Sequence, residues 1–262
     1  MLLTDKNGVL FFRFLNFSGF TELNHGIFTR NHGFSEGPYQ SLNVCAGVGD
    51  DIDRVRDNRH MIARLCGDGD LVFLKQVHGC DVTVIKDRDN ILSGKTVDGR
   101  LTGDAVITDI PGLNLVIQVA DCQAVLIYDP VRKVVANVHA GWRGSIQNII
   151  GATINRMQQQ FCSAPGDLMA GIGPSLGPCC AEFVNYRSEI PESFWKYSDK
   201  GNHFNFWWAS FDQLCDAGVS KKNIQIANIC TKCNPKLFFS YRRAGITGRF
   251  AAIIGLKQTA SG

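Results

Sequence analysis

The sequence lacks any uninterrupted apolar run of about 18 residues, the length a helix needs to cross a bilayer, so it predicts no membrane span. It also lacks a run of Lys and Arg: 27 basic residues face 24 acidic ones, a net charge of +3, which argues against a nucleic-acid-binding protein. The first apolar stretch contains Asp5 and Lys6 and no small-residue cleavage site follows, so we expect no signal peptide.

Internal repeats, low-complexity tracts and convincing linkers are absent as well. The 262 residues are 45% hydrophobic, which is enough for a sizeable core, and we expect one domain spanning residues 1–262. Ten cysteines is a high count. Without an export signal, reduced thiols and metal ligation are favoured over a disulfide framework, and we expect a cytoplasmic protein of unknown oligomeric state.

Hairpins and helices follow one another without a regular βαβ order, which predicts an α+β fold. We expect strands over residues 9–17, 25–29, 71–77, 82–85, 104–108, 113–120, 123–128, 134–139, 167–172, 224–229 and 251–256, and helices over 51–66, 145–161, from 181 onward and over 209–216. Residues 87–103 are polar and Gly-rich and are predicted to form a loop, either lying over the site or mobile.

Residues 113–144 carry the pattern around which the rest of the chain is interpreted. Within them, two β-branched apolar runs, 123–128 and 134–139, flank a polar break containing Pro130, which predicts a β-hairpin. A turn centred near Val131 would place Cys122 opposite Ala140 and diagonal to His139, whereas a slip of one residue would place Cys122 and His139 face to face. In either register a thiol and an imidazole meet at the end of the hairpin.

The sequence Ala140-Gly141-Trp142-Arg143-Gly144 follows His139 and precedes the helical pattern of residues 145–161. Gly141 and Gly144 permit tight turns, and Ser145 is a plausible N-cap. A helix N-terminus beside a Gly-rich turn suits an anion such as phosphate. The alternative is an ordinary strand–turn–helix junction.

Seven segments together resemble the laccase-domain (multicopper polyphenol oxidase-like) family. They are HGIFTRNHGFSEGPYQSLN (25–43), GDDIDRVRDNR (49–59), KQVHG (75–79), ADCQAVLIYDP (120–130), VHAGWRG (138–144), GIGPSLGPCC (171–180) and FFSYRRAGITGR (238–249). The resemblance implies a four-layer α/β/β/α sandwich with mixed sheets. It also implies a zinc-dependent purine nucleoside phosphorylase with adenosine deaminase side activity. Ala124 replaces the usual Pro, a change expected to be harmless, whereas Ala181 replaces a usual Tyr and could alter a pocket wall and with it the substrate preference.

Phosphorolysis of this kind converts adenosine, inosine or guanosine, with methylthioadenosine as a further candidate, and phosphate to free base and ribose 1-phosphate. Deamination converts adenosine to inosine. The expected partners are therefore small molecules, purine nucleosides and phosphate, with no nucleic acid and no membrane.

The strongest candidates for chemistry are His78, Cys122 and His139, each near the end of a predicted strand. One thiolate and two imidazoles suit Zn²⁺, and three protein ligands leave a fourth position open, as in catalytic sites. The resemblance assigns the metal to the same three positions. The alternative is a buried thiol and two unrelated histidines. Cu²⁺ could enter the site adventitiously.

Two other enzyme classes compete for these residues. Cys122 could be a nucleophile and His139 its base, as in a cysteine hydrolase or amidase, although the sequence does not reveal a third residue to orient His139. A copper-dependent polyphenol oxidase is less favoured. Such enzymes bind several copper ions mainly through histidine, and this chain has six histidines: His25, His32, His60, His78, His139 and His203.

Other residues are predicted around this centre. Arg143, Arg242, Arg243 and Arg249 are expected to bind phosphate, with Arg143 counted as catalytic beside Cys122 and His139. Ser41 and Asn43 could bind ribose or base, or simply form a turn. Gln76 and Asp121 each precede a proposed ligand and are expected to orient it. Cys230 and Cys233 form a C-x-x-C without a second pair, and Cys179 and Cys180 are adjacent.

Overall fold

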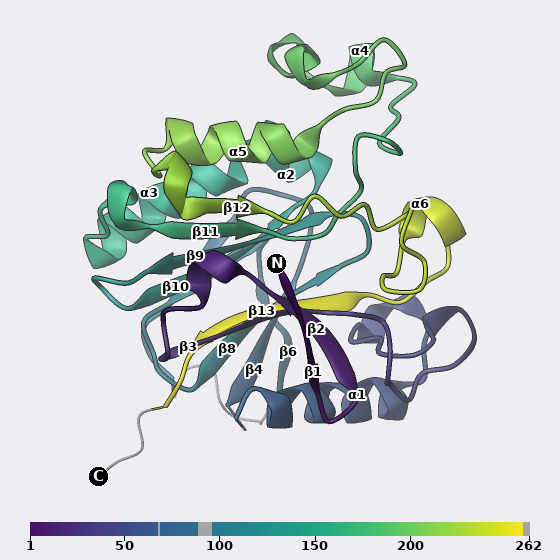
Figure 1. The fold of residues 1–262 in the computed structure, drawn as a ribbon, viewed down its shortest axis with the longest axis vertical. Coiled ribbons are helices and arrows are strands. Elements are labelled where there is room, and N and C mark those ends of the chain that lie inside the picture. The colour runs from purple at the N-terminus through teal and green to yellow at the C-terminus, as the bar shows by residue number, and fades with distance from the viewer. Residues whose placement is uncertain (68, 89–95, 259–262) are drawn as a thin grey trace.

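The fold consists of two mixed β-sheets packed face to face, with helices on both outer faces (Figure 1). It is a computed structural model that describes residues 1–67, 69–88 and 96–258. From bottom to top in Figure 1 the layers are α1, the seven-stranded sheet, the six-stranded sheet, and the group α2, α3 and α5. This arrangement agrees with the expected α/β/β/α sandwich. Among the described residues, no helix has the length and hydrophobicity to span a bilayer.

The seven-stranded sheet has the order β1-β2-β3-β13-β8-β4-β6. Its strands are β1 (Leu2–Lys6), β2 (Val9–Arg13), β3 (Leu23–Phe28), β13 (Phe250–Leu256), β8 (Leu113–Val119), β4 (Asp70–Lys75) and β6 (Thr96–Thr102). The β4 strand pairs in parallel with both β8 and β6, and the other pairs are antiparallel.

The six-stranded sheet has the order β12-β11-β9-β10-β7-β5. Its strands are β12 (Ile224–Ile226), β11 (Met169–Ile172), β9 (Gln123–Asp129), β10 (Val134–Ala140), β7 (Ala105–Thr108) and β5 (Val82–Ile85). Every residue of β9 and β10 is buried, because one face of the hairpin packs on the other sheet and the other face packs on helices.

The helices are α1 (Ile52–Leu65), α2 (Trp142–Ile146), α3 (Ile149–Phe161), α4 (Tyr186–Glu189), α5 (Phe206–Asp216) and α6 (Tyr241–Ala244), accompanied by short 3₁₀ turns. The sequence offers Asp50 or Asp51 as the cap of α1, and it is Asp51 that accepts from the backbone N–H of Asp53 and Arg54. Helix α3 buries Ile149, Ile150, Ile154 and Met157 against the six-stranded sheet.

A cluster of hydrophobic side chains lies between the two sheets. It includes Phe14, Phe17, Leu126, Phe238 and Phe250, all nearly inaccessible to solvent. Asn137 on β10 crosses this layer and donates from Nδ2 to the backbone oxygens of Leu115 and Ala252, at 2.9 Å each. The two sheets are therefore joined by hydrogen bonds as well as by apolar packing.

Several predicted elements differ from the structure. Residues 96–102 form the edge strand β6, which pairs with β4, although a polar sequence suggested loop throughout 87–103; residues 89–95 of that prediction lie outside the described residues. The helix expected from Ala181 is reduced to the single turn α4, because residues 181–183 instead hydrogen-bond to 202–204. The spacing of Ile52, Val55, Ile62 and Leu65 predicts that all four face inward from α1, yet Ile52 is half exposed on its first turn.

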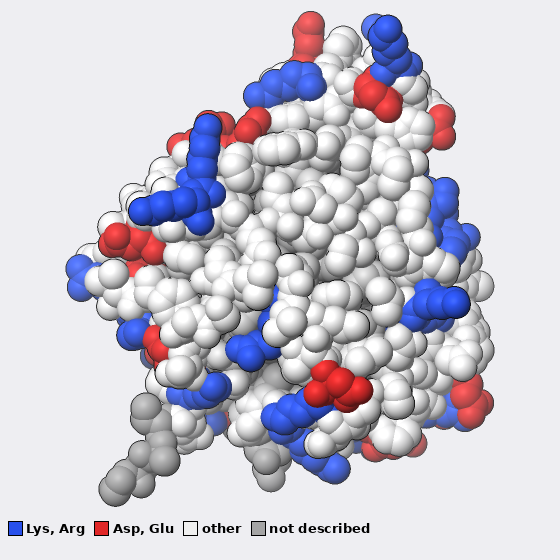
Figure 2. Space-filling view, viewed as in Figure 1, with Lys and Arg blue, Asp and Glu red and all other residues white. Residues whose placement is uncertain are grey.

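Figure 2 shows one broad face on which Lys and Arg alternate with Asp and Glu near the margin, while the centre is uncharged. This face has no continuous basic band.

Candidate metal centre and pocket

The β9–β10 hairpin forms as predicted, but in a register that the sequence did not specify. Asp129 pairs with Val134 and Ala124 pairs with His139, one residue away from the predicted alignment and two from its alternative. The turn decides this, because the Asp129 carboxylate accepts from the backbone N–H of Val131 and Arg132, at 2.9 Å each, and closes a four-residue loop.

Three side chains nevertheless meet at the open end of the hairpin. The ligand atoms of His78, Cys122 and His139 all lie within 4.8 Å of one another. The imidazole rings of His78 and His139 are 4.8 Å apart between centroids and nearly perpendicular. A Cβ atom added to Gly141 would lie 3.1 Å from His78 and 3.3 Å from the Cys122 sulfur. The Gly141 backbone therefore lies directly against the three side chains.

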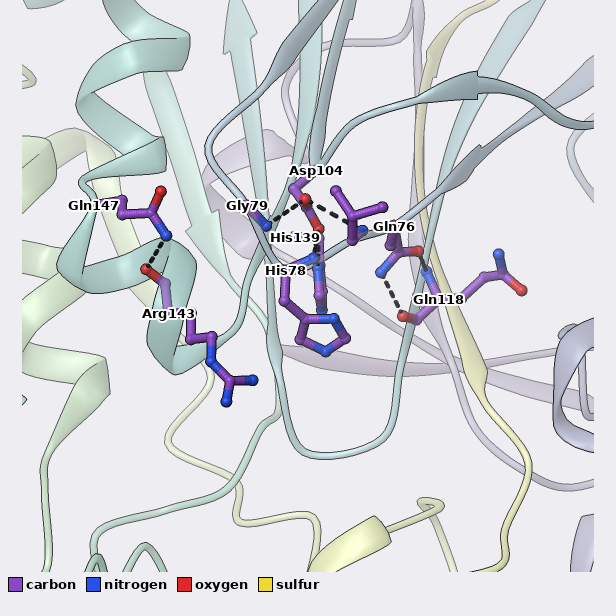
Figure 3. Close-up of polar contacts among 9 residues, drawn as sticks. Gln76, His78, Gly79, Asp104, Gln118, His139, Arg143 and Gln147 are labelled. Atoms are coloured by element: carbon purple, nitrogen blue, oxygen red, sulfur yellow. Dashed lines mark hydrogen bonds and ion pairs between the residues drawn. The ribbon is translucent and has the colours of Figure 1, made fainter. Parts of the chain in front are cut away.

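Asp104, just before β7, fixes the orientation of two of these residues (Figure 3). Its fully buried carboxylate binds His139 Nδ1 at 2.8 Å. The same carboxylate accepts from the backbone N–H of His78 at 2.9 Å and of Gly79 at 2.7 Å. With Nδ1 bonded to a carboxylate, His139 presents Nε2 to the cluster, the usual arrangement of a metal-binding histidine. No motif in the sequence pointed to Asp104, which lies 35 residues from His139 in the chain.

The backbone at the site is held in a conformation that few residues adopt. His78 has φ of 60° and Asp121, next to Cys122, has φ of 95°. Left-handed backbone at non-glycine residues is costly and tends to collect at functional sites. Asp104 accepts hydrogen bonds from the backbone N–H groups of Val77, His78 and Gly79, and these bonds stabilise the conformation of the 77–79 turn.

The cluster also has unusual proton affinities. Burial opposes ionisation of Cys122, yet the charge of His139 and hydrogen bonds from His139 and His78 outweigh it and lower the pKa of the thiol to about 6. Burial likewise opposes a charged His139, but the Cys122 sulfur and the Asp104 carboxylate raise its pKa to about 9. The pKa of Asp104 is lowered in spite of burial, chiefly by its hydrogen bond with His139. These groups together favour thiolate, the form that binds metals.

The donor set fits a soft or borderline cation. A thiolate and two imidazoles are typical Zn²⁺ ligands, whereas Mg²⁺ and Ca²⁺ prefer oxygen. Three ligands on one side leave room on the other, where the cluster opens into a pocket of about 710 Å³. This volume lies in the range of small-molecule sites.

The pocket wall is basic and aromatic. Five of its lining residues are cationic (Arg59, Lys75, Arg143, Arg242 and Arg249), four are aromatic (Trp142, Phe183, Phe206 and Tyr241), and Asp121 is the one carboxylate among the described lining residues. The Asp121 carboxylate already has hydrogen-bond partners within the protein, because it accepts from the Thr231 hydroxyl and the Arg242 backbone N–H, at 2.6 Å each. The free space therefore suits an anion beside a flat ring.

The arginines differ in how they are held. Arg143 is exposed, lies over the Trp142 ring at 4.6 Å, and extends to the same side as His78 in Figure 3. Arg242 donates to the backbone oxygen of Glu182 at 2.8 Å, and Arg249 to those of Thr247 and Gly248 at 2.9 and 3.0 Å. Arg243 lies away from the described pocket wall and donates to three backbone oxygens, so the structure does not support its expected contact with phosphate.

The helix after the hairpin begins earlier than predicted. Gly141 is the residue before α2. The helix is interrupted at Asn148, whose φ is 60°, and α3 then begins with Asn148 as its N-cap. Ser145 is therefore not an N-cap but a buried residue inside α2. A Cβ atom added to Gly144 would lie 3.0 Å from the Gly79 backbone oxygen, so α2 packs closely against the His78 turn.

Four predicted residues lie near the site without making the expected contacts. Gln76 exchanges two hydrogen bonds of 2.9 Å with the backbone of Gln118, and Asp121 binds Thr231 and Arg242, so the side-chain hydrogen bonds of both are directed to residues other than the three ligands. Ser41 binds the backbone of Gly33 and Arg30. Asn43 is fully buried and bonded to Cys45, Asp50 and Arg249. Ser41 and Asn43 lie off the described pocket wall, which favours the turn interpretation.

Comparison with known proteins places this geometry in context. Residues 24–257 match the family described as multi-copper polyphenol oxidoreductase laccase. A purine nucleoside phosphorylase of Bacteroides thetaiotaomicron is 33% identical over 241 residues, covering 87% of this chain and 89% of the relative. The adenosine deaminase RL5 of an unknown prokaryotic organism is 32% identical over 233 residues, covering 83% and 87%.

Solved structures agree with the sequence matches. YlmD from Geobacillus stearothermophilus superposes with a TM-score of 0.86 at 31% identity, over 97% of this chain and 98% of that one. The hypothetical protein YfiH of Bacillus licheniformis gives the same score and identity over 97% and 99%. The chain therefore belongs to the multi-copper polyphenol oxidoreductase laccase family, the family that its motifs resemble.

Proposed function

We propose that this protein is a zinc-dependent purine nucleoside phosphorylase with adenosine deaminase side activity. The observation that carries the proposal is the opening of the His78–Cys122–His139 cluster into a basic, aromatic pocket. The names of the relatives, purine nucleoside phosphorylase and adenosine deaminase, support the same two reactions.

In this proposal His78, Cys122 and His139 hold the zinc ion. A zinc ion at such a site supplies Lewis-acid polarisation and lowers the pKa of water. Asp104 keeps the Nδ1 proton of His139 in place, so that Nε2 faces the cation.

The pocket side chains divide the substrates between them. Arg143, Arg242 and Arg249 would bind phosphate through their guanidinium groups, and the aromatic side chains would pack against the purine. For phosphorolysis, a phosphate oxygen bonds to C1′ as the bond between C1′ and the purine nitrogen breaks, and the purine leaves with a proton. For deamination, water adds at C6 and ammonia leaves. Holding both reactants in one pocket supplies much of the rate gain.

A second candidate has its own supporting observation. Cys122, His139 and Asp104 are connected in the order of a nucleophile, a base and the group that orients the base, and the pKa of Cys122 is lowered to about 6. This is the arrangement of a cysteine hydrolase or amidase. His78 has no necessary part in it. A copper oxidase receives no comparable support, because among the described histidines only His78 and His139 join a group of metal-ligating type.

We also propose that residues 1–262 act as a single catalytic domain in the cytoplasm. The pocket is lined from both sheets, through Leu74 and Gln118 of one and Gln123 and His139 of the other. All ten cysteines are free thiols, which suits a reducing compartment.

The deciding experiment is chromatography of adenosine incubated with zinc-loaded protein, with and without phosphate. Adenine and ribose 1-phosphate formed only with phosphate would support phosphorolysis, and inosine in both samples would support deamination. Unchanged adenosine would refute the proposal. Chelation and His78→Ala should abolish both activities, whereas a cysteine hydrolase should survive both and be inactivated by alkylation of Cys122.

A further inference from the structure

Four cysteines that the sequence leaves unassigned come together at one place in the fold. Cys179 and Cys180 follow β11, and Cys230 and Cys233 follow β12. Their four sulfur atoms all lie within 4.8 Å of one another. The sequence offered only one C-x-x-C and an adjacent pair some 50 residues apart, so the second half of the site could not be recognised before the strands were placed.

The spacing of the sulfurs is that of a tetrahedral metal site. Zinc–thiolate bonds are about 2.3 Å long, and tetrahedral geometry then places the sulfurs ~3.8 Å apart. The Cys233 sulfur lies 3.6 Å from that of Cys179 and 3.5 Å from that of Cys180. A disulfide requires about 2.0 Å, and all four thiols are free.

The two loops that carry the four cysteines pack closely against each other. An added Cβ on Gly177 would lie 3.0 Å from Cys230 Cβ, so a glycine is what lets the two loops approach. The loops are joined by a parallel bridge between Ser175 and Cys230, with Thr231 N donating to the Ser175 oxygen at 3.0 Å.

We propose that Cys179, Cys180, Cys230 and Cys233 bind a zinc ion in a closed, four-thiolate structural site, distinct from the three-ligand centre. Four thiolates complete a tetrahedron and leave no open position, which is the pattern of structural rather than catalytic zinc. The inference does not depend on the proposed function.

The contacts of the two loops show what such an ion stabilises. Thr231, between two of the ligands, donates to the Asp121 carboxylate at 2.6 Å, and Asp121 adjoins Cys122. Arg242 Nη1 donates to the Cys180 oxygen at 3.3 Å. A zinc ion bound here would therefore hold together the two loops behind one wall of the pocket, the wall to which Asp121 and Arg242 belong.

The test is metal content, measured on full-length protein purified with reductant and loaded with Zn²⁺, then desalted. The wild-type chain should hold two zinc ions. Cys122→Ser should retain one, and Cys233→Ser and Cys180→Ser should each lose the other. Cys162→Ser is the matched control, because Cys162 is an exposed thiol outside the cluster and its replacement should leave both ions in place.

Cobalt substitution tests the ligand set even if the cluster variants fail to fold. Cys122→Ser loaded with Co²⁺ should show the strong thiolate charge-transfer absorption and visible bands of a tetrahedral four-sulfur site. A single zinc ion in wild-type protein that disappears in Cys122→Ser would overturn the proposal. A Cys180–Cys233 disulfide without a second metal, in protein kept reduced, would overturn it equally. Neither measurement involves turnover, so loss of the proposed activity would not be mistaken for loss of this site.

Discussion

The buried carboxylate of Asp104 offers the sharpest test of how the metal centre is built. Its Oδ1 atom binds His139 Nδ1 and the His78 backbone N–H, and its Oδ2 atom accepts from Gly79 at 2.7 Å and from Val77 at 3.3 Å. Replacement by Asn keeps one oxygen and converts the other acceptor into a donor. Either His139 or the 77–79 turn must then lose its partner.

The size of the effect follows from these contacts. Loss of an outer-shell partner of a metal ligand lowers metal affinity roughly 10–100-fold, or about 1.4–2.8 kcal/mol. A buried N–H left without an acceptor costs about 1–3 kcal/mol of stability. Asp104→Asn should therefore weaken zinc binding by one to two orders of magnitude and also destabilise the metal-free protein by an amount of that order.

Zinc affinity is measured by competition with a chromophoric chelator, and stability by urea denaturation of metal-free protein. Asp109→Asn is the control, since Asp109 is exposed just beyond the other end of β7 and makes the same change of charge. Zinc affinity of Asp104→Asn within about twofold of wild type would refute the assigned role, because the carboxylate would then be dispensable to His139.

Three further predictions concern single groups. Burial, aided by the charge of Arg13, lowers the pKa of His25 to about 3. In the unfolded chain His25 takes up a proton near its ordinary pKa of about 6.5, whereas in the folded chain it stays neutral down to about pH 3. The free energy of unfolding should therefore decrease below pH 6.5, by about 2 kcal/mol at pH 5. Urea titrations at pH 7 and 5 should show this loss in wild type and not in His25→Gln; equal losses would contradict it. Arg143→Ala should raise the phosphate KM roughly 10–100-fold with little change for adenosine, because a charged hydrogen bond contributes about 1.5–3 kcal/mol; Arg156→Ala, exposed on α3, should change neither KM. After chelation, alkylation of Cys122 should accelerate as the pH rises through about 6, and a midpoint above pH 8 would show that His139 does not stabilise the thiolate.

The sequence by itself determined the features that depend on near neighbours. A capping aspartate at 50 or 51 and the apolar spacing behind it predict α1, and short runs of apolar, β-branched residues predict β5, β9 and β10 within a residue or two. His78, Cys122 and His139 could be named because each lies at or just beyond a strand end, and because the surrounding motifs resemble one family.

Tertiary structure decided everything that joins distant residues. Asp104 reaches His139 across 35 positions because β7 pairs with β10, and Cys179 reaches Cys233 across 54 because the loops after β11 and β12 adjoin. Two other differences are local: the hairpin register depends on the Asp129 carboxylate two residues from Val131, and the break before α3 on the left-handed backbone of Asn148. β6 exists because the edge of β4 offers it hydrogen bonds. Such pairings depend on the order of strands in the sheets, which no local pattern of the chain encodes.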